Sequence, residues 1–172
     1  LISAGYFVSY KKIKAVNHGI AQKRERVFII GIKKDLYPTP SSEILKVSDV
    51  LSNLNIDHNG QLNFSPIART IERIKNLQPG EKLNKKYSCS RQRLIADKPS
   101  PTVTTRNLLI HPFEHRLLTP RELARIQSFP DDFIFTGTKT AMVKQIGNAV
   151  PPKLSELLAK KLYAEVVENE EQ

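Results

Sequence analysis

"QKRERVFIIG", residues 22–31, places two arginines directly before an apolar run. The run Val27-Phe28-Ile29-Ile30 predicts a buried strand, because short runs rich in β-branched and aromatic residues are typical of strands. Alternate side chains of an extended chain share a face, so Arg24 and Arg26 are expected on one side and Glu25 on the other. Two like charges on one face indicate that they hold an anion or an electron-rich group.

A β-hairpin is predicted around this stretch. Residues 6–16 are rich in aromatic and β-branched side chains and predict one strand, and residues 26–32 predict a second. Asn17-His18-Gly19 has the composition of a loop between them. Beyond Asp35, the run "YPTPSS", residues 37–42, is typical of a linker, so the hairpin is expected to end there.

The composition indicates a soluble domain with a polyanionic partner. The 172 residues are 40% hydrophobic and 26% charged, which suits one domain with a core. The formal net charge is +10, and residues 1–34 hold eight Lys or Arg against one acid. Residues 69–98 hold nine basic residues against three acids. Nucleic acid is the simplest such partner, because Lys and Arg neutralise its phosphates; a solvated basic surface is the alternative.

Several kinds of site and location are excluded by the same composition. Cys89 is the single cysteine, which rules out an internal disulfide and a multi-cysteine metal site. The four histidines lack metal-ligand spacing, so no metal is expected. No apolar stretch reaches the length of a membrane span, and the N-terminus lacks a signal-peptide pattern. We therefore expect a cytoplasmic protein without membrane contact.

One helix is specified by its own capping residues. Thr119 at the N-cap and Glu122 three residues later form a capping box, and Pro120 is favoured at the first helical position. The helix is expected to end at Phe129-Pro130, because a residue before proline is pushed out of the helical region.

Two further helices and a short strand are predicted from periodicity and breaker residues. Residues 66–77, with Ser65 at the N-cap, predict a helix, and residues 102–110 predict a strand. The last helix is predicted over residues 151–167. Its buried stripe is expected to consist of Leu154, Leu157, Leu158, Leu162 and Val166.

"QIGNAVPPKL", residues 145–154, predicts a turn at the start of the last helix. Gly147 permits a tight backbone, and the proline that follows Val150 holds it extended. Asn148 lies too far ahead of Pro151 to be an ordinary N-cap, so its amide is free to hold a partner at the mouth of the helix. From spacing alone, a turn that merely starts the helix is the favoured interpretation.

Taken in order, three segments resemble the last three sequence blocks of the DNA (cytosine-5) methyltransferases of the bacterial modification type. The segments are "HGIAQKRERVFIIG" (residues 18–31), "HRLLTPRELARIQSFPDDF" (115–133) and "QIGNAVPPKLSELLAKKL" (145–162). That family has a variable target-recognition region between the first and second blocks, and here this interval is the basic stretch from 35 to 116. "KPSPTVTT", residues 98–105, is also similar to the family, and the resemblance covers essentially the whole chain.

The resemblance implies an α/β fold, with edge strands and the C-terminal helix of a Rossmann-like methyltransferase domain plus a smaller irregular α+β target-recognition domain. Residues 1–34 are expected to be C-terminal strands of the catalytic domain, and residues 35–116 the target-recognition domain. Residues 117–144 would form a motif helix and loop at the base of the recognition domain. Residues 145–172 would form the cofactor-pocket turn and a helix that returns to the catalytic domain.

The resemblance also implies roles for the two arginines. In the family the target cytosine is flipped out of the duplex, a cysteine attacks carbon 6, and carbon 5 takes the methyl group of S-adenosylmethionine. Charge that develops on the ring needs a fixed donor, which a guanidinium supplies. Arg26 is expected to hydrogen-bond the O2 edge of the cytosine, and Arg24 to brace the site and its backbone phosphates. Both are candidate catalytic residues.

Cofactor and DNA contacts follow from the same resemblance. Asn148, helped by Ala149 and Val150, maps onto the family residues that close one wall of the S-adenosylmethionine pocket. Thr102 is expected to contact a DNA phosphate near the flipped base. Gln22 matches the family's glutamine and is another expected DNA contact. Arg91 and Arg93 are expected DNA contacts because arginines in the variable region can read bases. The middle motif is expected to be structural, with ion pairs formed by Arg121, Glu122 and Arg125.

Part of the family's active site has no counterpart in this sequence. The glycine-rich cofactor loop, the Pro-Cys nucleophile segment and the Glu-Asn-Val segment all precede these blocks in the family. Ala21 also stands where proline is usual. Cys89, in "YSCSRQR", lacks a preceding proline and is expected to be an ordinary cysteine. The chain is thus expected to be inactive alone, as a C-terminal portion or as one subunit of a split enzyme.

The expected partners are duplex DNA and the N-terminal catalytic part, in the same protein or as a separate subunit, with a cognate restriction endonuclease as a further partner. Two alternatives stay open: a non-catalytic DNA-binding relative and a tRNA-directed member of the family. A soluble α/β domain without a nucleic-acid role leaves the ordered motifs unexplained.

Overall fold

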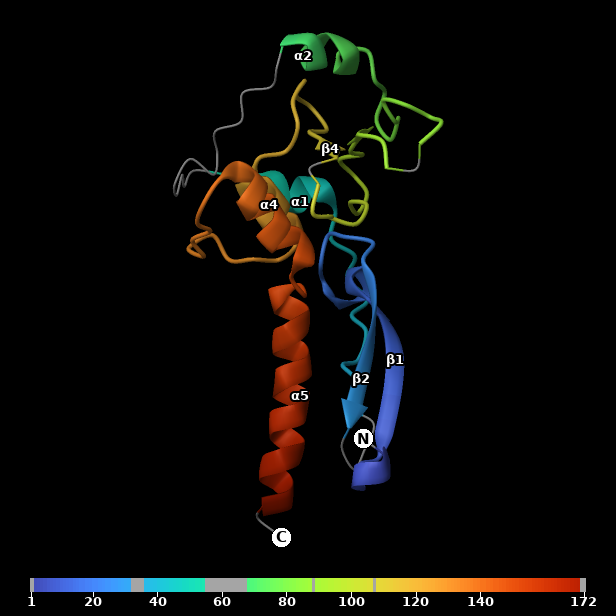
Figure 1. Ribbon diagram of the computed structural model, residues 1–172, viewed down its shortest axis with the longest axis vertical. Helices are drawn as coiled ribbons and strands as arrows, with labels where there is room; N and C mark the ends of the chain where they lie inside the picture. The colour runs from blue at the N-terminus through green and yellow to red at the C-terminus, as the bar shows by residue number, and fades with distance from the viewer. Residues whose placement is uncertain (1, 32–35, 55–67, 88, 107, 171–172) are drawn as a thin grey trace.

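The computed structural model describes residues 2–31, 36–54, 68–87, 89–106 and 108–170. A hairpin and a long helix extend from one end of a body that is built of short helices, short strands and loops (Figure 1). The two long elements come from opposite ends of the sequence, so the termini lie at the same end of the molecule.

The hairpin follows directly from the two apolar, β-branched segments. After a short 3-10 helix η1 (Ile2–Ala4), strand β1 (Val8–Lys14) pairs antiparallel with β2 (Glu25–Gly31). The connection includes the 3-10 helix η2 (Ala15–His18). The predicted hairpin with a long connection is therefore confirmed.

Helix α5 (Pro152–Glu170) packs against the base of this hairpin. Leu154 and Leu158 of the predicted stripe are buried, and Leu157 and Leu162 are half-buried, whereas the side chain of Val166 lies outside the described residues. The shared cluster consists of Ile13, Ala15, Ile20, Leu154 and Leu158. The predicted last helix is thus confirmed, and its first turns hold the hairpin in place.

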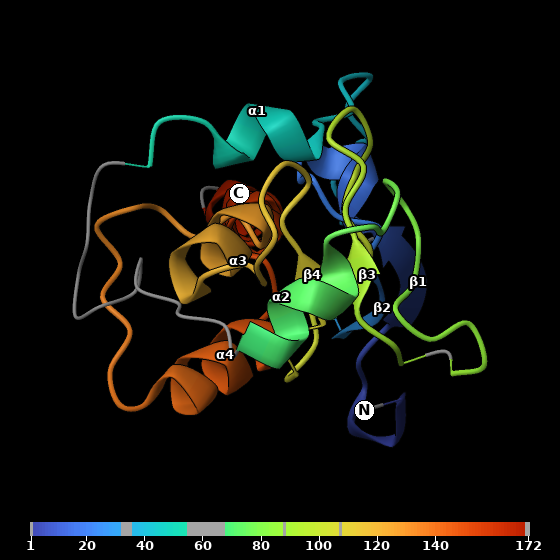
Figure 2. The ribbon, with the colours of Figure 1, turned by 90° about the horizontal axis from the view of Figure 1, so that it is seen from above.

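Three helices form the centre of the body. Helix α3 (Pro120–Ile126) packs between α1 (Val47–Leu51) and α4 (Lys139–Asn148), as Figure 2 shows. The predicted capping box of α3 is present, because Thr119 Oγ1 accepts from the amide of Glu122 and the Glu122 carboxylate accepts from the amide of Thr119. The predicted end at 129–130 is late: α3 ends at Ile126.

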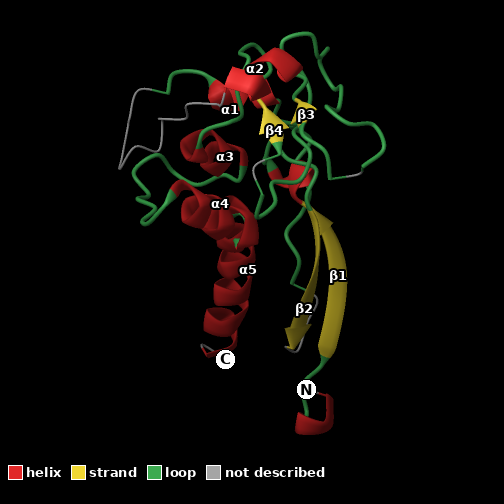
Figure 3. Cartoon of the chain, turned by 45° about the horizontal axis from the view of Figure 1, so that its top comes forward, coloured by secondary structure: helices red, strands yellow, loops and turns green. Residues whose placement is uncertain are grey.

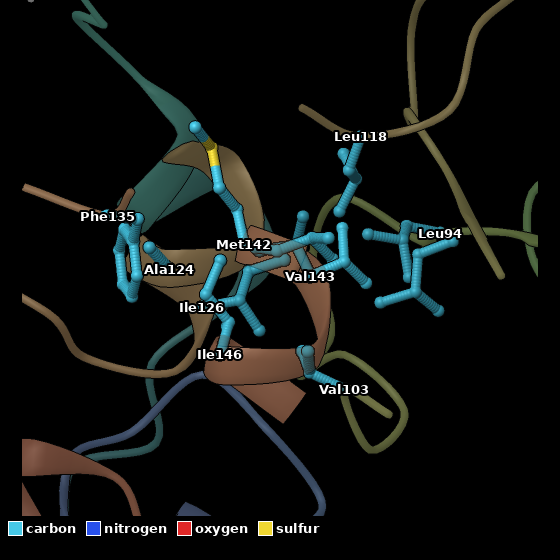
Figure 4. Packing of buried hydrophobic residues seen from close by; sticks show 12 residues of the cluster. Leu94, Val103, Leu118, Ala124, Ile126, Phe135, Met142, Val143 and Ile146 are labelled. Atoms are coloured by element: carbon cyan, nitrogen blue, oxygen red, sulfur yellow. The ribbon is translucent and has the colours of Figure 1, made fainter. Parts of the chain in front are cut away.

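The main core joins α3 and α4 to the loops of the middle segment (Figure 4). Val103 and Ile146 belong to the same cluster, and both are buried. The cluster consists of Val47, Leu94, Val103, Leu109, Leu118, Leu123, Ala124, Ile126, Phe135, Met142, Val143 and Ile146. This core therefore fixes the loop of residues 101–106, the 103 loop, relative to α4.

The rest of the body is mostly loop (Figure 3). Helix α2 (Ala68–Ile74) confirms part of the helix predicted over 66–77, while its predicted cap at Ser65 lies outside the described residues. Strand β3 (Gln92–Arg93) pairs in parallel with β4 (Leu109–Ile110). Of the strand predicted over 102–110, residues 109–110 are confirmed, residues 102–106 and 108 are not in a strand, and residue 107 lies outside the described residues.

One face of the hairpin carries three exposed apolar side chains together with exposed Lys12, which lies opposite Val27. Tyr10 of β1 lies opposite Ile29 of β2, and Val27 projects from the same face. These side chains are 78%, 65% and 61% exposed, respectively. Within the described residues the hairpin is a two-stranded sheet, so the outer edge of each strand is open to another strand.

Candidate functional site

Arg24 precedes β2 and points into the protein, with 3% of the residue exposed. Its Nη1 donates a hydrogen bond to the carbonyl oxygen of Val103, and its Nη2 donates to those of Gly147 and Ala149, all at 3.0 Å. One side chain therefore joins three parts of the chain: the first motif (residues 18–31), the 103 loop, and the junction between α4 and α5.

The two arginines of the first motif lie in different environments. Burial, and secondly the positive charge of Arg26, lower the pKa of Arg24 to about 10, so Arg24 stays protonated at neutral pH. Arg26 is exposed, and its Nη1 donates to the carbonyl oxygen of Glu25 at 2.7 Å. The expectation that both side chains share one surface is wrong, because Arg24 lies before the strand and faces carbonyl groups inside the protein. Arg26 is the one that a ligand can reach.

Gln22 and Gln127 form a buried amide pair beside Arg24. Both residues are 0% exposed. Gln22 Nε2 donates to Gln127 Oε1, and Gln22 Oε1 accepts from the amide of Val103 at 2.8 Å. Gln127 Nε2 donates to the carbonyl oxygens of Ile146 and Ala149, at 3.1 and 2.8 Å. The amide pair therefore ties together the same three segments as Arg24.

Burial of Gln22 corrects its expected role as a DNA contact. The nitrogen and the oxygen of its side-chain amide are both hydrogen-bonded inside the protein, and the residue exposes no surface to a nucleotide. Gln127 was not among the expected site residues, because no local pattern marks the residue at the end of α3 as the partner of Gln22.

The third motif forms the end of α4 and the link to α5. Asn148 and Val150 are exposed at this link, while Ala149 is half-buried and its carbonyl oxygen accepts from Arg24 and Gln127. The predicted turn at Gly147 is wrong, because Gly147 is the ninth residue of the ten-residue helix α4. Glycine is needed there for another reason: a Cβ on Gly147 would overlap the carbonyl group of Thr104.

The expected DNA contacts of the middle segment divide into reachable and buried residues. Thr102 is half-buried, and its Oγ1 donates to the carbonyl oxygen of Lys23 at 3.1 Å. Arg91 is half-buried. Arg93 is 4% exposed and donates to the carbonyl oxygens of Ile74 and His111 at 2.8 and 3.0 Å. Arg93 thus holds β3 against its surroundings and does not face a ligand.

The middle motif (residues 115–133) forms the ion pairs expected of Glu122 and Arg125. Glu122 pairs with Arg116 at 2.7 Å, and Arg125 pairs with Asp131 at 2.5 Å. Arg121 is fully buried and donates to the carbonyl oxygens of the loop that follows α3, those of Pro130 (3.0 Å) and Phe133 (2.5 Å). These contacts hold the loop that follows α3 against the helix, and Gln127 lies at the start of this loop.

Cys89 is exposed and lies at a cavity of about 250 Å³ that is also lined by Thr102, Thr104 and Arg106.

Among the described residues there is no group of His, Cys, Asp and Glu side chains that could hold a metal ion. In the same part of the chain, no helix is long and apolar enough to cross a membrane.

The arrangement joins three distant motifs around one buried guanidinium. At its surface it leaves an exposed guanidinium on β2, an exposed amide at the end of α4 and a threonine on the 103 loop. These groups can supply a positive charge, a polar amide and a hydroxyl to ligands, and the thiol of Cys89 lies at the same cavity as Thr102.

Comparison with known proteins gives one family for nearly the whole chain. The model of the C-5 cytosine-specific DNA methylases matches residues 1–164. A protein of Methanocaldococcus jannaschii described as a type II methyltransferase, M.MJ0563P, is 36% identical over 163 residues, which are 92% of this chain and 52% of that protein. Type II methyltransferase M1.HphI of Haemophilus parahaemolyticus is 34% identical over 90% of this chain and 47% of its own length. The chain thus spans about half the length of these relatives.

Another relative is matched over nearly its whole length. Type II methyltransferase M.AquIB of a Picosynechococcus strain is 39% identical in an alignment of 134 residues that covers 69% of this chain and 95% of that protein. Among solved structures, a prophage-encoded protein of Escherichia coli described as a DNA modification methyltransferase superposes with a TM-score of 0.80 at 26% identity, over 95% of this chain and 62% of its own. Two further solved methyltransferases, of Entamoeba histolytica and S. pombe, superpose with TM-scores of 0.66 and 0.65 at 16% and 14% identity. The three solved structures confirm the expected α/β, Rossmann-like fold class.

Proposed function

This chain belongs to the C-5 cytosine-specific DNA methylase family, and from that premise we propose that it is the C-terminal portion of a DNA (cytosine-5) methyltransferase. The complete enzyme transfers a methyl group from S-adenosylmethionine to carbon 5 of a cytosine flipped out of duplex DNA. The observation that carries the proposal is the set of three hydrogen bonds from Arg24, the Arg24 clamp, which joins the segments that contain Arg26, Thr102 and Asn148.

Arg26 contacts the flipped base. Its exposed guanidinium donates to O2 of the cytosine and stabilises the negative charge that builds on the ring during attack at carbon 6. Preorganisation matters here, because a donor that is already in place needs no reorganisation during the reaction.

Arg24 is a positioning residue. Its guanidinium is bonded to three carbonyl oxygens and shielded from solvent, so it acts on the reaction by holding the 103 loop and the α4–α5 link around Arg26. In this arrangement a phosphate contact is left to residues nearer the surface, Thr102 and Arg91.

The α4–α5 link fits one wall of a cofactor pocket. Asn148 presents an exposed amide with two donors and one acceptor, Ala149 is small, and Val150 offers an exposed apolar contact. These groups suit a ligand with both polar and apolar parts, and the carbonyl of Ala149 is already fixed by Arg24 and Gln127. When bound, S-adenosylmethionine supplies an electrophilic methyl group.

The nucleophile comes from the N-terminal catalytic part, in the same protein or as a separate subunit. The exposed apolar side chains of the hairpin and its open strand edges provide the docking surface for that part, since exposed Tyr10, Val27 and Ile29 are costly in water. Cys89 is not the nucleophile, because it lies on the recognition segment. The chain alone is inactive.

The biological setting follows from the names of the relatives. Type II methyltransferases are named for restriction-modification systems, so a cognate restriction endonuclease and a cytoplasmic location are part of the proposal. The segment containing Thr102 and Arg91 contributes to target recognition, with base readout in the major groove.

A methyl-transfer assay tests the proposal. Labelled S-adenosylmethionine is incubated with duplex DNA or with tRNA, and the chain is added alone or together with a polypeptide that carries the family's N-terminal blocks. Transfer to cytosine of duplex DNA only in the mixture supports the proposal. Transfer to tRNA alone supports the tRNA-directed alternative, and DNA binding without any transfer supports the non-catalytic one.

A further inference from the structure

A basic cavity lies between the loop that follows Thr104 and the first turns of α4. Its volume is about 240 Å³. Pro120 and Val143 give it apolar surface. The rest of the lining consists of Arg106, Lys139, Lys144 and the hydroxyl-bearing side chains of Thr105 and Thr140, and it contains no carboxylate among the described residues. We call these five residues the basic cavity. None of them belongs to the Arg24 clamp or to the α4–α5 link.

The two walls of the basic cavity are fixed to each other. Thr104 Oγ1 donates to the carbonyl oxygen of Arg106 at 2.9 Å and accepts from its amide at 3.3 Å, which closes the loop into a tight turn. The backbone of Thr104 and Thr105 packs so closely on Gly147 of α4 that a Cβ there would overlap it. Arg24 bridges the same two walls through Val103 and Gly147. The cavity is therefore built before any ligand arrives.

The charged and hydroxyl groups of the lining suit a phosphate. Arg106, Lys139 and Lys144 supply positive charges, and threonine hydroxyls donate to anionic oxygens. Contacts from lysine, arginine and threonine to phosphates position a protein on nucleic acid and carry no sequence information directly. Thr102 lies four residues before Arg106, a span of at most about 14 Å for an extended chain. A nucleic-acid strand that passes Thr102 thus comes within reach of the basic cavity.

We propose that the basic cavity binds a backbone phosphate of the substrate DNA, a few nucleotides from the flipped cytosine. This inference rests on the proposed function and adds a site to it, which sets the register of the duplex on the recognition segment. The phosphate is bound between the Arg106 loop and α4, so its binding also favours the clamped arrangement of these two walls.

The test compares Lys144→Ala, Arg106→Ala and the double variant with Lys161→Ala, which removes the same charge from an exposed position in the middle of α5. The protein used is the chain together with the N-terminal part, and binding to duplex DNA is measured from 50 to 200 mM salt. The site of methylation on a random-sequence duplex pool is read in the same samples.

Loss of one phosphate contact should reduce the slope of log K against log salt by about 0.9, so that the loss of affinity over this salt range becomes roughly 3- to 4-fold smaller. We expect this change for the double variant and a smaller one for Lys144→Ala and for Arg106→Ala, with an unchanged pattern of methylated sequences. Lys161→Ala should leave both readouts as in the parent protein.

Two outcomes overturn the inference while the proposed function stands. An unchanged salt slope in active variants would show that no phosphate binds in the cavity. A relaxed methylation pattern would show that the cavity reads bases. If the parent protein neither binds nor methylates duplex DNA, the proposed function fails and the basic cavity fails with it.

Discussion

Arg24 donates a 3.0 Å hydrogen bond to the carbonyl oxygen of Gly147, a residue 123 positions later in the chain. The bond joins the entrance of β2 to the last turn of α4, and the same guanidinium also holds the 103 loop. The three motifs by which the chain resembles its family are thus parts of one buried network, completed by Gln22 and Gln127.

Replacing Arg24 with lysine should destabilise the protein. A lysine can donate to one or two of the three carbonyl groups, and hydrogen bonds from charged donors contribute about 1.5–3 kcal/mol each. We expect Arg24→Lys to lower the free energy of unfolding by about 3 kcal/mol in urea denaturation. Arg26→Lys is the matched control, because Arg26 is exposed, and it should leave stability nearly unchanged. Equal stability of both variants would contradict the clamp.

Gln127→Glu should introduce a pH-dependent loss of stability. The carboxylate would be buried against the carbonyl oxygens of Ile146 and Ala149, which accept hydrogen bonds from the present amide. Burial raises the pKa of the new group in the folded state above that in the unfolded state, so stability falls as the pH rises. We expect a loss of about 3 kcal/mol at pH 8 and a smaller one at pH 5. Gln127→Ala should show a loss that does not vary with pH over this range.

Gly147→Ala and Asn148→Ala should separate folding from cofactor binding. The added methyl group at Gly147 overlaps Thr104, and overpacking of this kind costs about 1–3 kcal/mol. Asn148 is exposed, so its substitution should preserve the unfolding curve and weaken S-adenosylmethionine binding several-fold in calorimetry of the chain with its N-terminal part. Full cofactor affinity in Asn148→Ala would remove this residue from the pocket wall.

The loop that follows His111 should loosen in acid. Nδ1 of His111 accepts hydrogen bonds from the amides of Phe113 and Glu114, at 3.3 and 3.0 Å, which a doubly protonated ring cannot do. Burial lowers the pKa of His111 in the folded state below its usual value near 6.5. The unfolded chain therefore takes up the proton first, and stability is constant above about pH 6.5 and falls below it.

His111→Asn tests this origin, because the asparagine oxygen can replace Nδ1 as an acceptor without titrating. The free energy of unfolding at pH 7.5 and pH 5.5 should differ less in the variant than in the parent protein. A smaller slope should persist, since burial also lowers the pKa of His18. An identical pH dependence would exclude His111 as the cause.

The parts of the fold that depend on neighbouring residues could be predicted from the sequence. The start of α3 followed from Thr119 and Glu122, which meet within one turn, and the hairpin followed from two apolar segments. Helix α4 was missed, although Thr138 at its N-cap and buried Met142 and Ile146 give a helical pattern, because Gly147 was interpreted as a turn. Its close approach to Thr104 is a contact across 43 positions, which local sequence does not reveal.

The predictions of a strand from Thr102 and of a DNA contact at Arg93 were wrong for the same reason: contacts with residues distant in the sequence decide both. The β-branched run from Thr102 predicted a strand, but the amide of Val103 is taken by Gln22 and its carbonyl by Arg24, so a strand ladder has no backbone groups left there. Charge alone favoured Arg93 as a DNA contact. Its buried bonds to Ile74 and His111 depend on partners about 20 residues away on either side.

The rate of methyl transfer by Arg26→Ala tests the central claim most directly. The chain and its N-terminal part would be assembled with saturating duplex DNA and labelled S-adenosylmethionine, and single-turnover rates compared with those of the parent protein and of Lys161→Ala. Loss of one preorganised donor to a charge that develops in the reaction costs about 10²–10³ in rate. We predict a fall of that size for Arg26→Ala with an unchanged unfolding curve. A parental rate in Arg26→Ala would contradict the assignment of Arg26 to the flipped cytosine.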